Sequence, residues 1–345
     1  MLGAPYPILN EMRADNSRSS LRGAGELAIV DRIRRRAAPF PHGEVRVGIG
    51  DDCAVLRMKA GEEATITTDL SIENRHFRLA SHPPESIGHR TLARGLSDIA
   101  AMGARPIAAF LSLGLPKNLI TSTASRRSWL DRFLDGFQAL ADTHHTPLAG
   151  GDLAESPLAL ADIVVVGALP QGTALLRSGA HPGDLIYVTG ALGGSAAGLR
   201  SIVRRTTGSL TPRSDLAPHL WPAPRVQQGI WLRKRGVASA SIDISDGLST
   251  EIEHLCAESG VSAEIDLRTL PIFPGAMLED ALHGGEDYEL LFTAPPAAKL
   301  PPSIAGTPVT RIGKILKNRK GRASVALVDA SGRRPLQRRG WEHFL

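Results

Sequence analysis

The hydrophobic and polar positions of this chain follow two periods, which predicts helices and strands in alternation. Apolar residues recur at helical spacing over residues 25–36 and 86–102, and Leu92, Leu96 and Ile99 form one stripe of the second helix. Alternation with a period of two predicts strands over residues 64–69 and 239–245. The same patterns predict strands over 45–49, 107–113, 162–169, 185–189, 289–293, 309–315 and 324–328, helices over 126–141, 196–204, 225–235 and 248–259, and a glycine turn at Gly150-Gly151-Asp152.

Strands and helices are mixed along the whole chain, which favours an α/β or α+β protein. A length of 345 residues exceeds the roughly 100–200 residues of one domain, so two domains are expected. The composition shifts after Gly172, where a connecting stretch precedes the next predicted strand. We therefore expect an N-terminal domain over residues 1–170 and a C-terminal domain over residues 171–345. The pattern alone leaves the topology of each domain open.

The net charge of +5 includes two groups of arginines near the ends of the chain. Such groups could bind nucleic acid, but no aromatic-interleaved basic motif, zinc-finger spacing or recognition helix accompanies them. A solvated basic surface that attracts small anionic substrates fits the same charge, and no nucleic-acid partner is expected. The arginines are Arg32, Arg34, Arg35 and Arg36, and Arg333, Arg334, Arg338 and Arg339.

Neither membrane insertion nor secretion is indicated by the apolar runs. The longest run, Ile163 to Leu169, is far shorter than the ~20 residues needed to span a bilayer, and Met1 to Ser20 lack a basic start followed by an apolar core. The two cysteines, Cys53 and Cys256, lie far apart without a CxxC motif, so we expect both to be buried small hydrophobes. These features predict a cytoplasmic protein.

Aspartates recur at the ends of apolar or glycine-rich segments, and this is the strongest chemical signal in the chain. Carboxylates gathered in one place repel each other unless a divalent cation lies among them. Mg²⁺ held by carboxylates usually accompanies substrate phosphates, so the pattern predicts metal-dependent phosphate chemistry. The segments are Gly48-Ile49-Gly50-Asp51-Asp52, Thr67-Thr68-Asp69, Leu96-Ser97-Asp98, Gly150-Gly151-Asp152 and Asp243-Ile244-Ser245-Asp246-Gly247.

The predicted elements place some of these groups side by side. Period two puts Thr67 and Asp69 on one strand face, and Asp243 and Ser245 on one face of another strand. Asp98 lies beside the apolar stripe of its helix, near a glycine that permits close approach. Taken singly, each aspartate is as readily a turn or cap residue, at roughly even odds. No GxxxxGK[ST] phosphate cradle occurs, so phosphates would have to be met through cations.

Three further positions could contact a substrate. His76 alone is a weak signal, whereas Glu286 follows two glycines directly before an apolar strand, which is typical either of a site at a strand mouth or of a charged turn. Trp341 could anchor the tail or stack on a flat ligand. No pair of general acid and base stands out. A phosphate acceptor needs no base because its oxygen is already anionic, so alignment and charge neutralisation suffice.

Taken together, these motifs resemble thiamine-monophosphate kinase, a family of the ATP-binding superfamily that includes aminoimidazole ribonucleotide synthetase and selenophosphate synthetase. The resemblance extends from about Gly25 to Phe344. It implies Mg²⁺-dependent transfer of the γ-phosphoryl group of ATP to thiamine monophosphate, which gives thiamine diphosphate. It also implies a two-domain aminoimidazole ribonucleotide synthetase-like fold whose N-terminal domain pairs with a second copy in a dimeric β-barrel. The lead before Gly25 matches nothing in the family.

The resemblance also implies a role for individual residues. The magnesium ligands would be Asp52, Thr67, Thr68, Asp69, Asp98, Asp152, Asp243 and Asp246. ATP would contact Gly151, Asp152, Arg177 and Ser245, with Arg177 as a cationic phosphate clamp. Thiamine monophosphate would contact His76, Glu286 and Trp341. The chain departs from the family pattern at Gly95, Leu153 and Gly194, where an asparagine, a threonine and an aspartate are common.

Rival functions remain from two classes. Another ATP-dependent synthetase of the superfamily is the nearest, although a selenophosphate synthetase would need a reactive cysteine or selenocysteine in an N-terminal glycine-rich loop, and neither cysteine fits. A nucleotide-binding regulator without turnover is disfavoured by the intact carboxylates. A nucleic-acid-binding protein would show salt-dependent binding to DNA, which no motif here supports.

Overall fold

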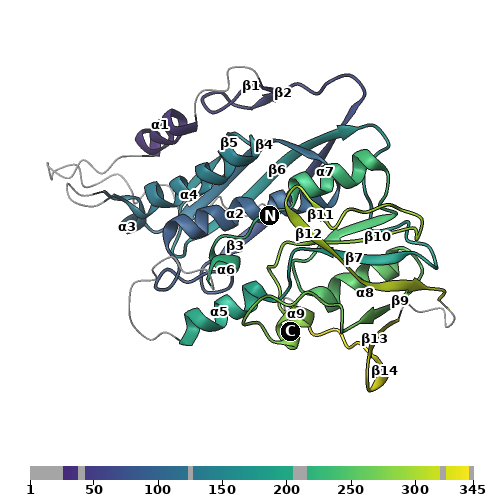
Figure 1. Ribbon diagram of the computed structural model, residues 1–345. Helices are drawn as coiled ribbons and strands as arrows, with labels where there is room; N and C mark the ends of the chain where they lie inside the picture. Colours follow the sequence, from purple (N-terminus) through teal and green to yellow (C-terminus); the bar gives the residue numbers. More distant parts are fainter. Residues whose placement is uncertain (1–25, 38–42, 123–126, 205–215, 319–323, 342–345) are drawn as a thin grey trace, which may run out of the picture.

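The computed structural model describes residues 26–37, 43–122, 127–204, 216–318 and 324–341, which form two large β-sheets, a two-stranded hairpin and the helices packed on them (Figure 1). The lead before Gly25 lies outside the described residues. Among those residues no helix is both long and apolar enough to cross a bilayer. We call the first sheet with its helices the N-terminal lobe and the second sheet with its helices the C-terminal lobe.

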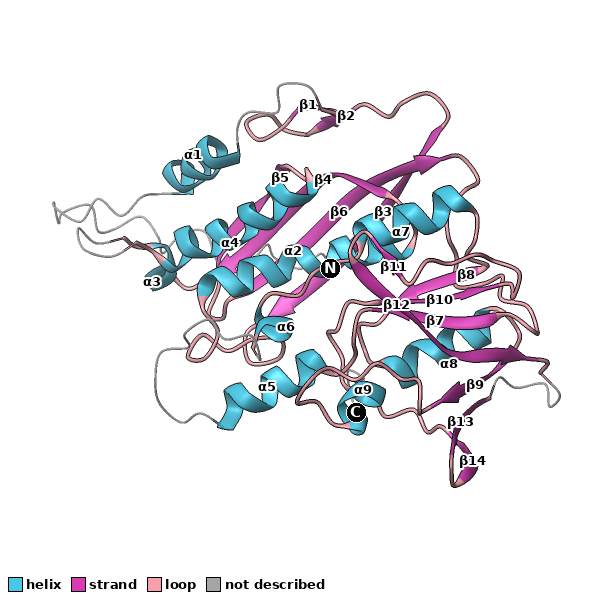
Figure 2. Ribbon diagram, in the orientation of Figure 1, coloured by secondary structure: helices cyan, strands magenta, loops and turns pink. Residues whose placement is uncertain are grey.

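The N-terminal lobe is a four-stranded sheet of order β3-β6-β4-β5, in which only the β4–β5 pair is parallel. Two helices cover one face of this sheet (Figure 2). The strands are β3 (Glu62–Ile72), β4 (Arg105–Leu115), β5 (Leu148–Glu155) and β6 (Leu160–Pro170), and the covering helices are α2 (Pro84–Ala101) and α4 (Trp129–His144).

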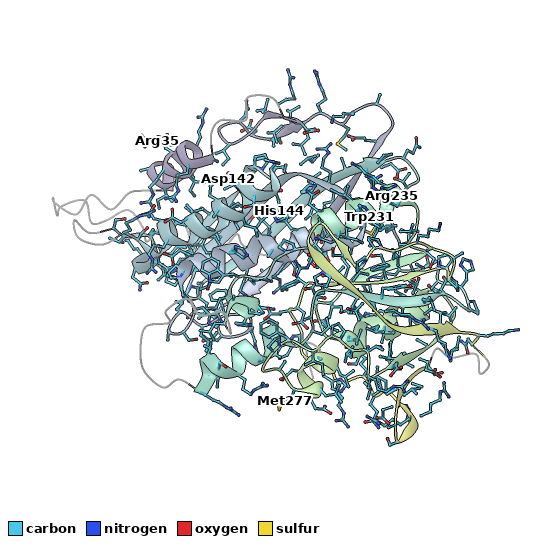
Figure 3. The ribbon with its side chains drawn as sticks, in the orientation of Figure 1. Arg35, Asp142, His144, Trp231, Arg235 and Met277 are labelled. Carbon is cyan, nitrogen blue, oxygen red and sulfur yellow. The ribbon has the colours of Figure 1, made fainter. Side chains whose placement is uncertain are left out.

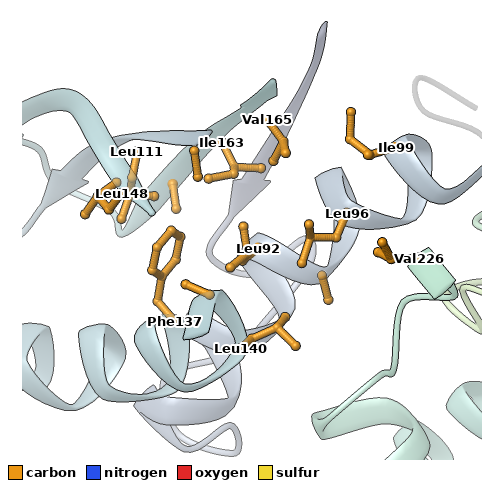
Figure 4. Packing of buried hydrophobic residues seen from close by; sticks show 14 of the residues in the cluster. Leu92, Leu96, Ile99, Leu111, Phe137, Leu140, Leu148, Ile163, Val165 and Val226 are labelled. Carbon is orange, nitrogen blue, oxygen red and sulfur yellow. The ribbon is translucent and has the colours of Figure 1, made fainter. Parts of the chain in front are cut away.

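The core of this lobe is a contiguous layer of aliphatic and aromatic side chains between the sheet and α2 and α4. Leu92 and Leu96 from α2 meet Phe137 from α4 and Ile163 from β6 (Figure 4). The two helices cross at contact distance because Gly88 faces the backbone of α4, where an added Cβ would lie 1.9 Å from the carbonyl oxygen of Phe133. The predicted apolar stripe of α2 is thereby confirmed as the centre of the core.

The other face of the sheet is only partly covered. A short hairpin of β1 (Val45–Val47) and β2 (Val55–Leu56) lies over the strands near β4 and β5. On β3 the exposed face carries Ile66, which is 68% exposed, and Leu70, which is 46% exposed. No closed barrel occurs among the described residues. α1 (Glu26–Ala37) and α3 (Lys117–Ile120) complete the lobe.

The C-terminal lobe is built on a larger, mostly antiparallel sheet of order β14-β13-β9-β12-β7-β10-β8, with β11 paired to β12. Only β9 and β13 run parallel. Its strands are β7 (Leu185–Thr189), β8 (Ala240–Asp243), β9 (Ser262–Asp266), β10 (Leu290–Ala294), β11 (Ser303–Ile304), β12 (Thr307–Leu316), β13 (Val325–Asp329) and β14 (Gly332–Pro335), and its helices are α5 (Gly194–Arg204), α6 (Ala217–Leu220), α7 (Val226–Arg235), α8 (Leu248–Glu258) and α9 (Leu278–His283).

Helix α7 joins the two lobes. Gly229 on α7 lies so close to α2 that an added Cβ would be 1.9 Å from the carbonyl oxygen of Ala100. On the same helix the Arg235 guanidinium lies 5.7 Å from the ring centre of Trp231 (Figure 3). This close packing fixes the N-terminal lobe against the C-terminal lobe and so sets the shape of the space between them.

The predicted helices and strands that fall on described residues are confirmed, with two corrections. The turn expected at residues 150–152 is wrong, because these residues lie inside β5, where Gly151 has a φ of 147° and presses against the carbonyl of Leu111. Cys256 is buried as expected, but Cys53 is exposed in the loop between β1 and β2, directly after Asp51 and Asp52. The sequence patterns also missed strands β2, β9, β11 and β14 and helices α3, α6 and α9.

Candidate active site

A cleft of about 640 Å³ lies where the two lobes meet. The end of β3 and the polar face of α2 form its N-terminal wall, and α5, the end of β8, the loop before β10 and the segment after β14 form its C-terminal wall. Among the predicted site residues, Asp69, His76, Asp98, Asp243, Ser245, Asp246, Glu286 and Trp341 line this cleft.

Strand β3 and helix α2 hold the first carboxylates. The predicted alternation is confirmed, since Thr67 and Asp69 both face α2. Thr67 Oγ1 donates to Asp98 Oδ2, and Arg94 donates to Asp69 Oδ1 from Nε at 3.0 Å and from Nη2 at 2.6 Å. Gly95 permits this approach, because an added Cβ would lie 2.5 Å from Cγ2 of Val165. The departure at Gly95 is therefore a packing requirement in this chain.

Asp243 brings a carboxylate from the C-terminal lobe to the same place. It ends β8, is almost fully buried, and accepts a hydrogen bond of 2.6 Å from Ser97 Oγ on α2. Burial raises the pKa of Asp98 to about 6, and the nearby charge of Asp69 adds to the shift. Burial likewise raises the pKa of Asp243 well above its usual range, and the negative charge of Asp98 adds to it. The three acids therefore share one electrostatic environment.

These acids fit a hard divalent cation in chemistry, although their side chains do not yet converge on one point. Among the described residues no three His, Cys, Asp or Glu side chains are arranged as a metal site. Instead Asp69, Asp98 and Asp243 are each held by a separate hydrogen-bond donor. Buried carboxylates with raised pKa values and oxygen-only donors are what Mg²⁺ can stabilise. Cation binding would therefore require the side chains to exchange these donors for the ion.

Glu251, a buried acid that was not predicted from the sequence, fixes the Ser245–Asp246 loop. Glu251 Oε1 accepts from the backbone N–H of Asp246 at 3.1 Å and from Ser245 Oγ at 3.3 Å. The carbonyl of Ser245 accepts from the N–H of Glu286 at 2.7 Å, and that of Asp246 from the N–H of Trp341 at 3.2 Å. The loop thus ties the predicted phosphate side of the cleft to the predicted substrate side.

Glu286 is a carboxylate of the cleft that is paired with the buried Arg90. Burial opposes its charge, but the Arg90 guanidinium, 2.6 Å away at Nη2, together with the Arg94 guanidinium holds the pKa of Glu286 down to about 2. Its backbone has a φ of 63°, and Asn74 on the facing wall has a φ of 64°. Left-handed backbone at non-glycine residues costs energy and is common at functional sites. Both positions lie in loops that line the cleft.

Several predicted residues do not line this cleft. Thr68 points to the exposed face of the sheet, since side chains alternate along β3. Gly151 and Asp152 lie on β5, at the opposite edge of the sheet from Asp69: in register, Asp69 faces Ile163, Ile163 faces Leu111, and Leu111 faces Gly151. Three strand spacings amount to roughly 14 Å. Asp52 is exposed next to the β1–β2 hairpin, and Arg177 is exposed but near enough to act on the charge of Asp98.

Helix α2 contributes polar residues that the sequence analysis did not single out. Arg90, Arg94 and Ser97 lie on the side of α2 that faces the cleft, where they contact Glu286, Asp69 and Asp243. Their spacing of three and four residues, continued by Asp98, marks one polar helix face and was a detectable signal.

The other two departures from the family sequence pattern also have packing reasons. Leu153 packs on the core of the N-terminal lobe, and Gly194 faces Pro218 and Phe273.

Family comparisons cover nearly all of the chain. Residues 50–169 match the N-terminal domain of AIR synthase related proteins, and residues 181–326 match their C-terminal domain. The chain is 36% identical over 338 residues to a thiamine-monophosphate kinase of Escherichia coli O157:H7, covering 93% of this chain and 98% of that protein. It is 34% identical over 323 residues to one from Bacillus subtilis strain 168, covering 88% of this chain and 95% of that protein.

Solved structures agree with this similarity. A crystal structure of thiamine-monophosphate kinase from Stenotrophomonas maltophilia K279a matches with a TM-score of 0.74 and 36% identity, covering 87% of this chain and 96% of that one. A structure of AaThiL complexed with AMPPCP and TMP matches with a TM-score of 0.71 and 30% identity, covering 95% of this chain and 99% of that one.

Proposed function

The chain belongs to the thiamine-monophosphate kinases of the AIR synthase related family, and from that premise we propose how its cleft performs their reaction. It catalyses the ATP-dependent phosphorylation of thiamine monophosphate, which gives thiamine diphosphate and ADP. The observation that carries the mechanism is that one cleft brings Asp69, Asp98 and Asp243 together with Glu286 and Trp341.

We propose that the acids of the cleft hold magnesium and, through it, the phosphates of ATP. The ligands would be Asp69, Asp98, Asp243 and Asp246, with Thr67 orienting Asp98. Bound Mg²⁺ would neutralise phosphate charge and polarise the transferred group. Arg177, which already acts on the charge of Asp98, would clamp a phosphate, and Ser245 would contact the nucleotide.

The acceptor would lie between His76, Glu286 and Trp341. Trp341 is 51% exposed at the cleft mouth, where its ring would stack on a flat heterocycle. The positive charge of Arg90 stabilises the Glu286 carboxylate, so Glu286 stays ionised. It can therefore accept hydrogen bonds from a ligand at any physiological pH. The acceptor phosphate is itself anionic, so the chain has only to align it with the donor and to exclude water.

A homodimer would explain the residues that lie outside their own cleft. The exposed apolar face of β3 is available to pair with a second copy, as the dimeric barrel of the resemblance requires. We propose that this barrel forms and that Asp52, Thr68, Gly151 and Asp152 act across it, in the site of the partner copy. The separation of Asp69 and Asp152 across the width of the sheet supports this division.

One assay tests the proposed function. Purified protein with ATP, Mg²⁺ and thiamine monophosphate should form thiamine diphosphate and ADP, free thiamine should not replace the monophosphate, and EDTA should abolish turnover. Turnover that persists after chelation would remove magnesium from the proposal. Absence of product with active ATP consumption on another acceptor would instead favour a different ATP-dependent synthetase of the superfamily. The predicted cytoplasmic location is consistent with the supply of ATP and Mg²⁺ and stays a prediction.

A further inference from the structure

A buried chain of hydrogen bonds runs behind Glu286 and joins both lobes. His82 precedes α2, Arg90 lies on α2, His219 lies on α6, and Ser195 lies in the first turn of α5. All four are at most 5% exposed. His82, Ser195 and His219 also line the cleft. The network therefore borders the space that a ligand would occupy.

The charges in this network fix where the protons lie. Arg90 Nη1 is 3.2 Å from His219 Nε2, and a guanidinium can only donate. His219 Nε2 must therefore accept. His82 Nε2, 3.1 Å from the same nitrogen, must donate as well. His82 Nδ1 then carries no proton, so it accepts from the backbone N–H of Arg78 at 3.2 Å, and its 3.3 Å approach to the Arg78 carbonyl oxygen is not a hydrogen bond.

The proton of His219 consequently lies on Nδ1. Burial and the charge of Arg90 lower the pKa of His219 to about 3, so the ring is neutral and carries one N–H. That N–H donates to Ser195 Oγ, 3.0 Å away, and it lies 3.7 Å from Glu286 Oε2. A hydroxyl that accepts from histidine keeps its own hydrogen free to donate. Among the described residues the Ser195 O–H has no hydrogen-bond acceptor, and Ser195 lines the cleft.

Ser195 is held where it lies by the residue next to Glu286. Asp287 accepts from the backbone N–H of Gly193 at 2.6 Å and from that of Ser195 at 3.2 Å. Glu286 and Asp287 are neighbours in sequence, so one carboxylate faces the cleft while the other fixes the start of α5. The spacing between the Ser195 hydroxyl and the Glu286 carboxylate is therefore set by the backbone and by the shared neighbour His219.

We propose that Ser195 and Glu286 form a donor–acceptor pair that recognises the aminopyrimidine edge of the acceptor. The Glu286 carboxylate accepts from the exocyclic amino group, and the Ser195 hydroxyl donates to the adjacent ring nitrogen. Ser195 Oγ and Glu286 Oε2 both lie next to His219 Nδ1. This arrangement fits a ligand edge on which a hydrogen-bond donor and an acceptor are adjacent. Arg90 and His219 act as positioning residues. The inference rests on the proposed function, because it assigns the specificity of that same substrate.

Oxythiamine monophosphate is the probe that separates this pair from general pocket packing. In this analogue a carbonyl oxygen replaces the amino group and the adjacent ring nitrogen carries a hydrogen, so both hydrogen-bond roles are reversed. A buried site that pairs with polar ligand groups rejects such analogues strongly. Titration calorimetry of the wild-type chain should show at least about 100-fold weaker binding of the analogue than of thiamine monophosphate.

Two variants test the two halves of the pair. Ser195→Ala should weaken binding of thiamine monophosphate by about tenfold. It should also reduce the ratio of the Kd values for the analogue and thiamine monophosphate, and it should leave the Kd for ATP unchanged. Glu286→Gln, which offers an amide donor, should shift the preference toward the analogue. Ser262→Ala is the matched control, because it removes a buried hydroxyl on β9, in the sheet of the C-terminal lobe. It should change neither the Kd for thiamine monophosphate nor the ratio of the Kd values for the analogue and thiamine monophosphate.

The outcomes separate this inference from the proposed function. Unchanged discrimination in both Ser195→Ala and Glu286→Gln, with wild-type folding by circular dichroism, would overturn the donor–acceptor pair even if turnover is normal. Wild-type binding of thiamine monophosphate without phosphoryl transfer would overturn the proposed function, while the binding ratios still decide the pair. Absence of any binding by the wild-type chain would overturn both.

Discussion

Ser97 and Asp243 come from different lobes, and their side chains meet in a hydrogen bond of 2.6 Å beside the cleft that Asp243 lines. Ser97 precedes Asp98 on α2, so the same helical turn that binds Asp243 also presents a second carboxylate to it. The pair therefore does two things. It fixes the two lobes relative to each other, and it brings acids from both sheets close enough for their negative charges to repel each other.

The first prediction follows from this arrangement. Asp243→Asn should lower kcat on the order of 100-fold, because a charge that stabilises the transition state is lost. The variant should fold normally, since burial already disfavours the charged form of Asp243 and an amide can still accept from Ser97. Steady-state kinetics and urea unfolding measure the two effects. Wild-type kcat in this variant would remove Asp243 from the metal site.

The second prediction uses neighbours that lie on opposite faces of β3. Asp69→Asn should lower kcat on the order of 100-fold, whereas Thr68→Val should leave the binding of thiamine monophosphate unchanged. Thr68 faces away from its own cleft, so any loss of kcat in Thr68→Val must arise from the copy packed against that face. Kinetics and calorimetry of both variants make the comparison. Unchanged kcat in Thr68→Val would remove Thr68 from the site of the partner copy.

Sequence periodicity was sufficient to predict the local elements and the sharing of faces. The period of two placed Thr67 with Asp69, and helical spacing placed Asp98 beside a core stripe with Gly95 next to it, and all of these placements are observed. These are local properties, which depend only on side-chain direction along one element. The resemblance to a known family supplied the fold and the reaction, which periodicity left open.

Properties that depend on contacts between distant segments could not be read in this way. The Arg90–His219–Ser195 chain joins residues from three elements, and each of these residues is unremarkable within its own segment. The placement of Asp152 depends on strand order, which the pattern did not fix. Gly150-Gly151 resembles a turn locally, yet the neighbouring strand β4 draws both glycines into the sheet.

A third prediction concerns the aromatic residue at the cleft mouth. Trp341→Ala should raise the KM for thiamine monophosphate about tenfold, because stacking on a base is worth ~1–3 kcal/mol. Trp341→Phe should restore part of this loss, since it keeps a smaller aromatic face. The KM for ATP should stay constant in both variants. An unchanged KM for thiamine monophosphate in Trp341→Ala would place the substrate elsewhere.

The proposed dimer gives a fourth prediction. Ile66→Lys should convert the wild-type dimer to a monomer of 36.7 kDa in sedimentation velocity, because a two-fold interface would bury the lysine twice. Met277→Lys, at a similarly exposed apolar residue on the other lobe, should stay dimeric (Figure 3). Mixing inactive Asp69→Asn and Asp152→Asn homodimers should restore about one quarter of wild-type activity if each site uses both copies. No recovery after subunit exchange would confine the site to one chain.

The buried histidine pair gives a fifth prediction, on stability. Burial, with help from the charge of Arg90, lowers the pKa of His82 from 6.5 to about 4, against an opposing pull from Glu286. Between pH 6.5 and 4, His82 is therefore protonated in the unfolded chain but not in the folded chain. The contribution of His82 to stability is complete above pH 6.5 and is lost as the pH falls toward 4, at up to about 1.4 kcal/mol per pH unit. The His82→Gln variant, which cannot titrate there, should lose stability less steeply than the wild type between pH 6.5 and 4.5 in urea unfolding. Parallel curves for the two proteins would mean that folding does not lower the pKa of His82.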